Sequence, residues 1–273
     1  MLLADAAALT IIALFVGTVS SMIGVGGGFL MVPILTLLYS VITQQAVGTS
    51  SAVIVVNAIA SSFAYYRQRR IDYRVGATLA LGTVPGAIIG AYLTRLISSG
   101  LLAALFGAFL VFVALRMLFM RERKAMASDP RTGVLRWHRV LVDASRNQFS
   151  FFVDIPLGVG LSFFGGLASG LFGVGGGAVM VPVMNLVMGI PMHVSVATSM
   201  FMMIFTSISG AVTHVALNHV LPEYAAALSL GIVGGSQIGA SLARRLRPAM
   251  LQRIFSLFLV FIGVRMIWPY FMY

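Results

Sequence analysis

One glycine-rich sequence occurs twice in the chain, and its residue types suit the binding of an anion. GVGGG stands at Gly24–Gly28 and again at Gly173–Gly177, and Pro33 and Pro182 follow the two copies at the same distance. Each glycine destabilises a helix interior by about 1 kcal/mol relative to alanine, so each copy predicts a helix break. A break that leads into a helix presents unpaired N–H groups at the positive end of the helix dipole, and glycine lets a ligand approach the backbone.

Hydroxyl residues follow both breaks at matching positions. Thr49 and Ser50 come after the first break, and Thr198 and Ser199 come after the second, near the start of the next predicted helix. Such hydroxyl groups either cap a helix or donate to a bound oxyanion, and the residue types leave both roles open.

Asn57 and His214 are the best remaining candidates for polar contacts inside the membrane, with Gln237 and Thr206 after them. The predicted substrate-binding residues are Gly24, Gly26, Gly27, Gly28, Thr49, Ser50, Asn57, Gly173, Gly175, Gly176, Gly177, Thr198, Ser199 and His214. Close helix packing is the alternative role for these glycines, and the expected role for Gly82, Gly86, Gly90, Gly231, Gly235 and Gly239. Arg116 and Arg265 are expected to extend to lipid headgroups, with substrate contact as the alternative.

The acidic residues argue against a cation carrier. All seven lie at the ends of predicted spans or in loops: Asp5, Asp72, Glu122, Asp129, Asp143, Asp154 and Glu223. A cation carrier or a carboxylate proton relay normally places an acid within a span. The sequence therefore predicts an anion site built from N–H and hydroxyl donors, with no metal, cofactor or catalytic group.

The elements that must position these residues are membrane spans. The chain has 273 residues, of which 59% are hydrophobic and only 9% are charged; a soluble protein has about 25% charged residues. Apolar stretches reach the length of about 20 residues that crosses a bilayer. The net charge of +11 is explained by basic loops on one side of a membrane rather than by nucleic-acid binding. No basic residue precedes the first apolar run, so we expect no cleavable signal peptide.

The chain is a duplication. Residues from about 5 to 117 match residues 149 positions later without a gap, so that Ile89-Gly90-Ala91 aligns with Ile238-Gly239-Ala240. Residues 1–119 form repeat one, 120–152 a basic linker and 153–273 repeat two. The expected spans of repeat one are 3–23, 29–44, 46–66, 75–94 and 101–119; those of repeat two are 155–172, 178–192, 195–217, 224–243 and 249–270. Within the linker, 134–142 is a candidate for a short amphipathic surface helix, although a linker without its own function is favoured.

Charge predicts that the two repeats are inverted. The loop after 46–66 is basic in repeat one, with Arg67, Arg69 and Arg70, whereas the equivalent loop of repeat two is not; after the next span the bias reverses. Basic loops face the cytoplasm, so equivalent loops lie on opposite sides. Each repeat then crosses five times, or three times with a re-entrant hairpin at the glycines. Both arrangements place the linker in the cytoplasm and both termini in the periplasm.

The sequence resembles the TauE/SafE-type sulfite exporters, also called toluene-sulfonate uptake permeases. The resemblance rests on the paired GVGGG…VP elements, on Gly48-Thr49-Ser50-Ser51 and Ala197-Thr198-Ser199, and on the two halves. It implies transport of a small sulfur-containing anion, such as sulfite or an organosulfonate, often outward across a bacterial inner membrane. Ala197 replaces Gly48, so the two repeats need not contribute equally.

We therefore predict an all-α polytopic membrane protein of two inverted repeats, which carries a small sulfur oxyanion by alternating access at the repeat interface. It is not expected to be an enzyme, because GVGGG matches neither a P-loop nor GxGxxG. The alternatives are an anion channel and an intramembrane hydrolase that uses Ser207 or Ser209 with His214. Coupling to protons or sodium, and assembly into oligomers, are left open.

Overall fold

The computed structural model describes residues 3–119, 136–243, 256–257 and 259–268. Seven of the described helices are long and apolar enough to cross a membrane, which confirms the class of protein. The elements of repeat one are α1 (Leu3–Ile23), α2 (Gly28–Pro33), the π-helical turn η1 (Ile34–Leu38), α3 (Thr43–Arg67), α4 (Tyr73–Leu93) and α5 (Ser99–Phe119). Those of repeat two are α6 (Ile155–Phe172), α7 (Gly177–Pro182), η2 (Val183–Val187), α8 (Met192–Ala216), α9 (Pro222–Leu242) and an apolar helix at Leu259–Trp268.

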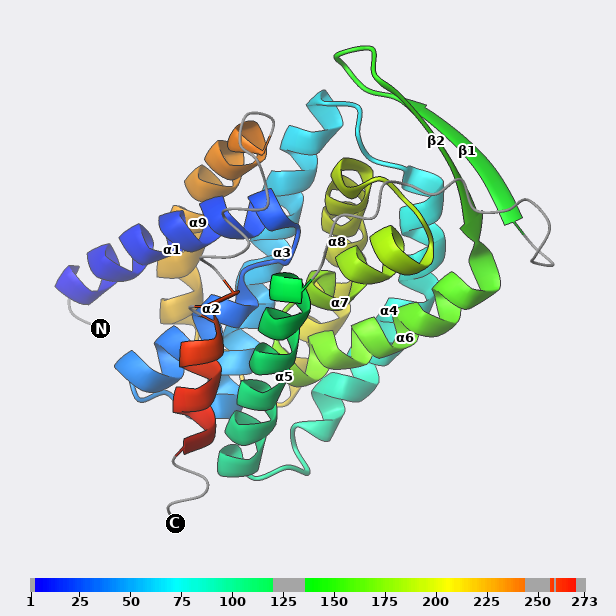
Figure 1. Cartoon of the computed structure of the whole chain (residues 1–273). Coiled ribbons are helices and arrows are strands. Elements are labelled where there is room, and N and C mark those ends of the chain that lie inside the picture. Colours follow the sequence, from blue (N-terminus) through cyan, green and yellow to red (C-terminus); the bar gives the residue numbers. More distant parts are fainter. Residues whose placement is uncertain (1–2, 120–135, 244–255, 258, 269–273) are drawn as a thin grey trace.

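The two repeats interlock. Helix α1 packs along α9 and α6 packs along α4, so the first helix of each repeat lies against the other repeat, while α3 and α8 pack together at the centre (Figure 1). Glycines make this contact close. A Cβ atom at Gly86 would lie 2.2 Å from the carbonyl oxygen of Phe163, and one at Gly235 would lie 2.1 Å from that of Leu14. The packing role expected for these glycines is confirmed.

The linker contains a β-hairpin, and the expected surface helix at 134–142 is wrong. Strand β1 (Arg136–Val142) pairs antiparallel with β2 (Gln148–Asp154). Side chains alternate along β1, so that Trp137 and Leu141 pack on the protein while His138 and Val140 are exposed. This alternation has the period of a strand and not that of a helix. The hairpin extends from one end of the helical body (Figure 1).

Helices α3 and α8, which are equivalent in the two repeats, run antiparallel. Thr49, near the start of α3, accepts a hydrogen bond from the backbone N–H of Leu221, beyond the end of α8 (3.0 Å). Thr198, near the start of α8, accepts one from Asp72, beyond the end of α3 (3.1 Å). We call the end with loop 68–72 and the hairpin the hairpin face, and the end with loop 217–221 the opposite face.

The first broken helix begins and ends at the opposite face. The hydroxyl of Thr10 in α1 donates to the carbonyl of Ala227 near the start of α9 (3.1 Å). After η1, the ring of Tyr39 stands edge-on to that of Tyr224 in the first turn of α9, with centroids 5.9 Å apart. Helix α1 and the pair α2–η1 therefore begin and end on the same side of the helical body.

Candidate functional site

The two glycine breaks meet inside the protein. A Cβ atom at Gly28 would lie 1.8 Å from the carbonyl oxygen of Gly173, and one at Gly177 would lie 2.1 Å from that of Gly24. The backbones therefore touch, and no other residue type fits. Gly27 and Gly176 also have φ angles of 95° and 80°, in the left-handed region that L-residues with a Cβ avoid.

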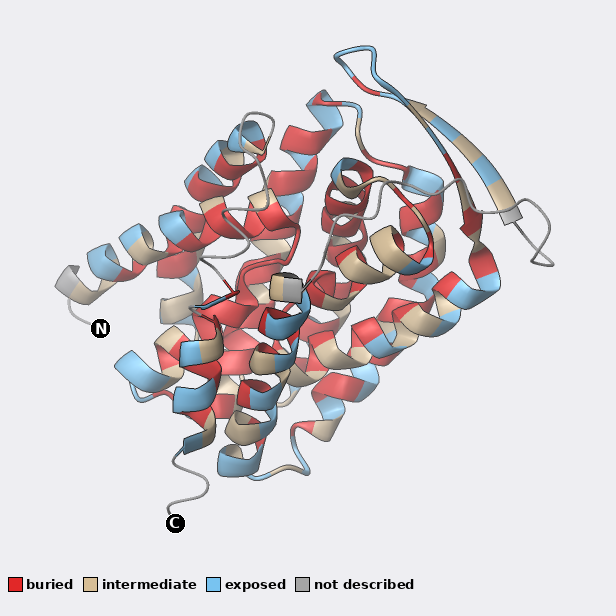
Figure 2. Ribbon diagram, in the orientation of Figure 1, coloured by how far each residue is buried: buried red, intermediate tan, exposed pale blue. Residues whose placement is uncertain are grey.

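The meeting point lies at mid-height of the helical body. Ile54 and Met203, the side chains nearest to both Gly26 and Gly175, stand near the middle of the 25-residue helices α3 and α8. The break residues are all buried, and Figure 2 shows the buried residues concentrated in this central region. The pairs α2–η1 and α7–η2 each have 11 residues, which as a helix extend about 16 Å, or half of a bilayer core. Each pair therefore runs from the centre to one face only.

Ser50 and Ser199 bind the breaks, each across the repeat boundary. The hydroxyl of Ser50 donates to the carbonyl of Gly173 (2.8 Å), and that of Ser199 donates to the carbonyl of Gly24 (3.1 Å). The Ser50 proton thus joins one repeat to the other, whereas the Ser199 hydroxyl also contacts the carbonyl of Val196 in its own helix (2.8 Å). Thr49 and Thr198 act as acceptors for Leu221 and Asp72, as described above, so they brace the two loops rather than face the breaks.

Asn57 is held against the first break by a buried polar network. Its side-chain nitrogen donates to the carbonyl of Gly26 (2.8 Å) and to the hydroxyl of Ser20 (3.1 Å), while its oxygen accepts from Ser61 (3.3 Å). The equivalent residue of repeat two, Thr206, instead bonds to Thr83 (2.6 Å). The two breaks therefore have different polar surroundings, and only the first has an amide beside it.

His214 lies apart from the break contacts, near the end of α8. Its Nε2 is 3.0 Å from the carbonyl oxygen of Gly170 in α6, and its Nδ1 is 3.4 Å from Nδ1 of His219. Tyr65, the equivalent residue of repeat one, likewise donates from its hydroxyl to the carbonyl of Ser21 (2.6 Å). The structure therefore brings the glycines, Ser50, Ser199 and Asn57 together, and places His214 at the opposite face.

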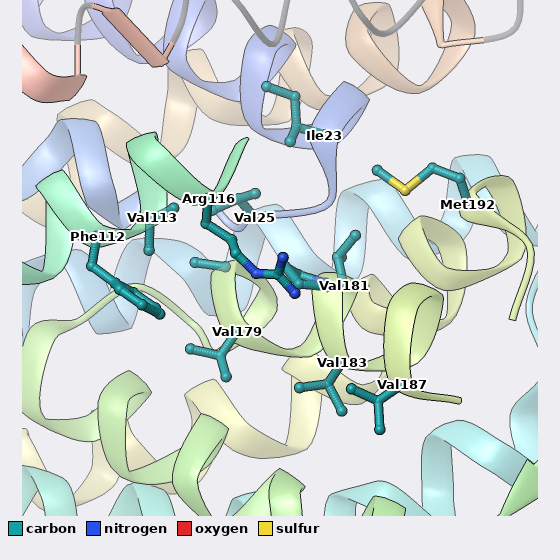
Figure 3. Close-up of a pocket in the computed structure, with 12 residues that line it drawn as sticks. Ile23, Val25, Phe112, Val113, Arg116, Val179, Val181, Val183, Val187 and Met192 are labelled. Atoms are coloured by element: carbon teal, nitrogen blue, oxygen red, sulfur yellow. The ribbon is translucent and has the colours of Figure 1, made fainter. Parts of the chain in front are cut away.

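A cavity of about 160 Å³ lies beside the breaks. Its walls are apolar and come from α1, the first break, α5, α7, η2 and the start of α8. Val25 and Ala178 line it beside the glycines, and among the described residues its only charged lining residue is Arg116. The Arg116 guanidinium points between Val25 and Val181 (Figure 3). This volume holds several water molecules or a small anion.

Arg116 is exposed at the end of α5 and also lines this cavity, so its extension to lipid headgroups stays a prediction, with substrate contact as the alternative. A basic residue in the last turn of a span usually extends to lipid headgroups, and nothing in the one-dimensional pattern distinguishes a cavity from lipid. The usable signal was the register of the duplication, which keeps an arginine at 116 and at 265. Apolar walls with one well-placed polar group are typical of small-molecule sites.

The serines of the hydrolase hypothesis do not contact its histidine. Ser207 donates to the carbonyl of Met203, and Ser209 donates to that of Thr206 (2.9 Å), both within their own helix. His214 is bonded to Gly170 and His219 instead. The hydrogen bond between nucleophile and base that such a mechanism requires is therefore not made by these residues.

Comparison with known proteins decides the family. The model of the sulfite exporter TauE/SafE family matches residues 9–266. The chain belongs to this family. Among its relatives, the probable membrane transporter protein YunE of Bacillus subtilis is 33% identical over 267 residues, which cover 95% of this chain and 96% of the relative. A probable membrane transporter protein of Methanocaldococcus jannaschii is 27% identical over 274 residues, which cover 95% and 94%.

This member of the TauE/SafE family is therefore a multi-pass membrane transporter. Its seven long apolar helices and its similarity to probable membrane transporters over nearly whole chains agree on this. No solved structure gives a significant match to the chain, so the geometry described here rests on this chain alone.

Proposed function

We propose that the protein is a secondary carrier of a small sulfur-containing oxyanion, such as sulfite or an organosulfonate, and works by alternating access. The observation that carries the proposal is the cavity at the glycine breaks, which the Arg116 cation lines. The family's name supports the substrate class. A site with an arginine and backbone N–H donors favours an oxyanion, because both groups donate charge-assisted hydrogen bonds to it.

The antiparallel run of α3 and α8 supports inverted repeats. Inverted repeats with broken helices that meet near the midplane are a common build of secondary transporters. Because the first broken helix is re-entrant, each repeat crosses three times in this arrangement. The described basic loop residues on the hairpin face, Arg67, Arg69, Arg70, Arg74, Arg139 and Arg146, support a cytoplasmic location for that face, with both termini in the periplasm and the inner membrane as the location.

In this scheme, the groups at the glycine breaks exchange hydrogen-bond partners during transport. An anion enters from the hairpin face, pairs with Arg116 and reaches the break, where Gly27 and Gly28 precede the first hydrogen bonds of their helix. The hydroxyls of Ser50 and Ser199 then turn from the facing carbonyls to the anion. Because these two bonds join the repeats, their release lets one repeat move relative to the other.

The test is sulfite flux in proteoliposomes of the purified protein, with sulfate and chloride as competitors. We expect saturable flux that sulfite on the far side accelerates. Arg116→Gln should raise KM by about tenfold or more, since a hydrogen bond to a charged group contributes about 1.5–3 kcal/mol. Arg95→Gln, which removes an exposed arginine outside the cavity, is the matched control. Flux that neither saturates nor accelerates would indicate a channel, and an unchanged KM for Arg116→Gln would contradict the cavity's role.

A further inference from the structure

Two histidines meet at the opposite face, and the mechanism above does not use them. The His214 side chain is fully buried in the last turns of α8, and His219 lies partly buried in loop 217–221. Their Nδ1 atoms are 3.4 Å apart. Because a carbonyl only accepts, the 3.0 Å contact with Gly170 assigns a proton to Nε2 of His214. Its Nδ1 then carries a lone pair, which accepts the Nδ1–H of His219.

Packing alone does not require a histidine here. In repeat one the equivalent carbonyl, that of Ser21, is satisfied by the hydroxyl of Tyr65, a group that stays neutral at physiological pH. The residue equivalent to His219 is Arg70, which pairs with Asp143 (3.2 Å). Repeat two therefore replaces a tyrosine and a paired arginine with two imidazoles, each of which has a nitrogen that can accept a proton.

The histidine pair connects loop 217–221, at the opposite face, to the second glycine break. The carbonyl of His219 rests on Gly48, where a Cβ atom would lie 2.4 Å from its oxygen. Two residues on, Leu221 bonds to Thr49. On the other side, Gly170 is three residues before Gly173, which ends α6 and accepts from Ser50.

We infer that His214 and His219 form a proton relay that couples anion transport to the proton gradient. The inference rests on the proposed function. A proton from the aqueous side binds Nε2 of His219, and the Nδ1 proton of His219 then passes to Nδ1 of His214. His219 is left neutral, and His214 becomes a buried imidazolium. That charge stands at the C-terminal end of α6, where the helix dipole favours a cation, and it favours an anion at the neighbouring break.

The direction of the pH effect follows from burial. Desolvation lowers the pKa of His219 in this conformation, so protonation favours a conformation in which the loop is more hydrated. The conformation in which loop 217–221 partly buries His219 has its full stability above the ordinary histidine pKa of about 6.5. It loses stability as the pH falls below that value. From α3 and α6, the pair is faced by the backbones of Gly48 and Gly170. Other described titratable or charged groups at this face are Asp5, Tyr39, Tyr92, Arg95, Glu223 and Tyr224.

His214→Tyr is the informative variant, because it copies Tyr65 and keeps a donor for the carbonyl of Gly170 while it removes the relay. In proteoliposomes we expect it to keep sulfite exchange at equal pH and to lose the acceleration that an imposed pH gradient gives the natural protein. His138→Gln, which changes an exposed histidine of the hairpin that bonds to Ser150 (2.9 Å), should respond like the natural protein. Retained gradient-driven flux in His214→Tyr would overturn the inference.

A second readout does not depend on transport. The chain has four histidines, and nitrogen NMR of the purified protein follows each of them. We expect the signals of His214 and His219 to change together as the pH is lowered. In His219→Gln, we expect His214 to stay neutral at every pH measured. Independent titration of the two would overturn the relay. Absence of sulfite exchange in the natural protein, with coupled titration intact, would instead contradict only the proposed substrate.

Discussion

At the scale of the residue, the glycines of the two breaks are fixed by contact. Gly28 and Gly177 face carbonyl oxygens of the other repeat at distances that exclude a side chain. Gly160 and Gly210, in contrast, have nothing within 4 Å of an added Cβ atom. Glycine is thus required at 28 and 177 because the backbones touch there, whereas no steric contact requires it at 160 and 210.

This difference predicts opposite effects of the same substitution. Gly28→Ala and Gly177→Ala should abolish stable folding or lower the melting temperature in detergent markedly. Gly160→Ala and Gly210→Ala should be neutral or stabilise by up to about 1 kcal/mol, because alanine favours a helix. Thermal unfolding and the yield of monodisperse protein measure both. Equal melting temperatures for all four variants would show that the breaks do not pack as described.

At the scale of the element, ion pairs hold the hairpin to the membrane helices. Arg139 makes a two-fold contact with Asp72 (2.8 and 3.0 Å), and Arg70 pairs with Asp143 (3.2 Å). The side chains of Asp72 and Asp143 are both 1% exposed. Asp72 also caps α4 through the N–H of Val75 (3.2 Å). The hairpin therefore helps to fix the loop that Thr198 braces.

Removal of one partner should release the hairpin. Arg139→Gln leaves the buried carboxylate of Asp72 without its cation, which we expect to cost about 1–3 kcal/mol of docking free energy. Hydrogen exchange in 136–154 should rise by about tenfold or more, while His138→Gln should leave it unchanged. Unchanged exchange in Arg139→Gln would mean that apolar packing alone holds the hairpin.

The ion pair of Arg70 with Asp143 should also withstand mild acid. Burial alone raises the pKa of Asp143, but hydrogen bonds from Asn147, Arg70 and Ser145 outweigh it and leave the pKa below its ordinary value. For a carboxyl with a lowered pKa, the stabilisation is present above the unfolded pKa of about 3.9 and is lost as the pH falls through the folded value. Between pH 7 and 5, the protection of hairpin amides from hydrogen exchange should therefore hold.

At the scale of the whole molecule, the contacts of the two repeats correspond in pairs. Ser50 with Gly173 matches Ser199 with Gly24, and Thr49 with Leu221 matches Thr198 with Asp72. These contacts join the repeats, so residues 1–119 and 153–273 mark the duplication rather than two separately packed domains. Strand β2 also runs on to Asp154, so α6 begins directly at the end of the hairpin.

The proposed orientation is testable because the chain has no cysteine. Ser145→Cys places a thiol at the exposed turn of the hairpin, and Ser98→Cys places one in the exposed loop before α5 at the opposite face. In intact cells, a membrane-impermeant maleimide should label only Ser98→Cys, and Ser145→Cys should react after permeabilisation. The reverse pattern would invert the proposed topology, and labelling of both in intact cells would contradict the crossing scheme.

The sequence by itself determined the membrane class, the duplication, the two helix breaks and the family. Each of these follows from hydropathy, from register or from local backbone preference, which the order of residues contains directly. Only the tertiary structure decided that the first broken helix begins and ends on the same side of the helical body, that Ser50 binds Gly173 and that Arg116 lines a cavity. It also made 136–142 a strand. These features depend on partners that stand far apart along the chain or in a second strand, and a local pattern does not state which distant backbone will lie opposite a given side chain.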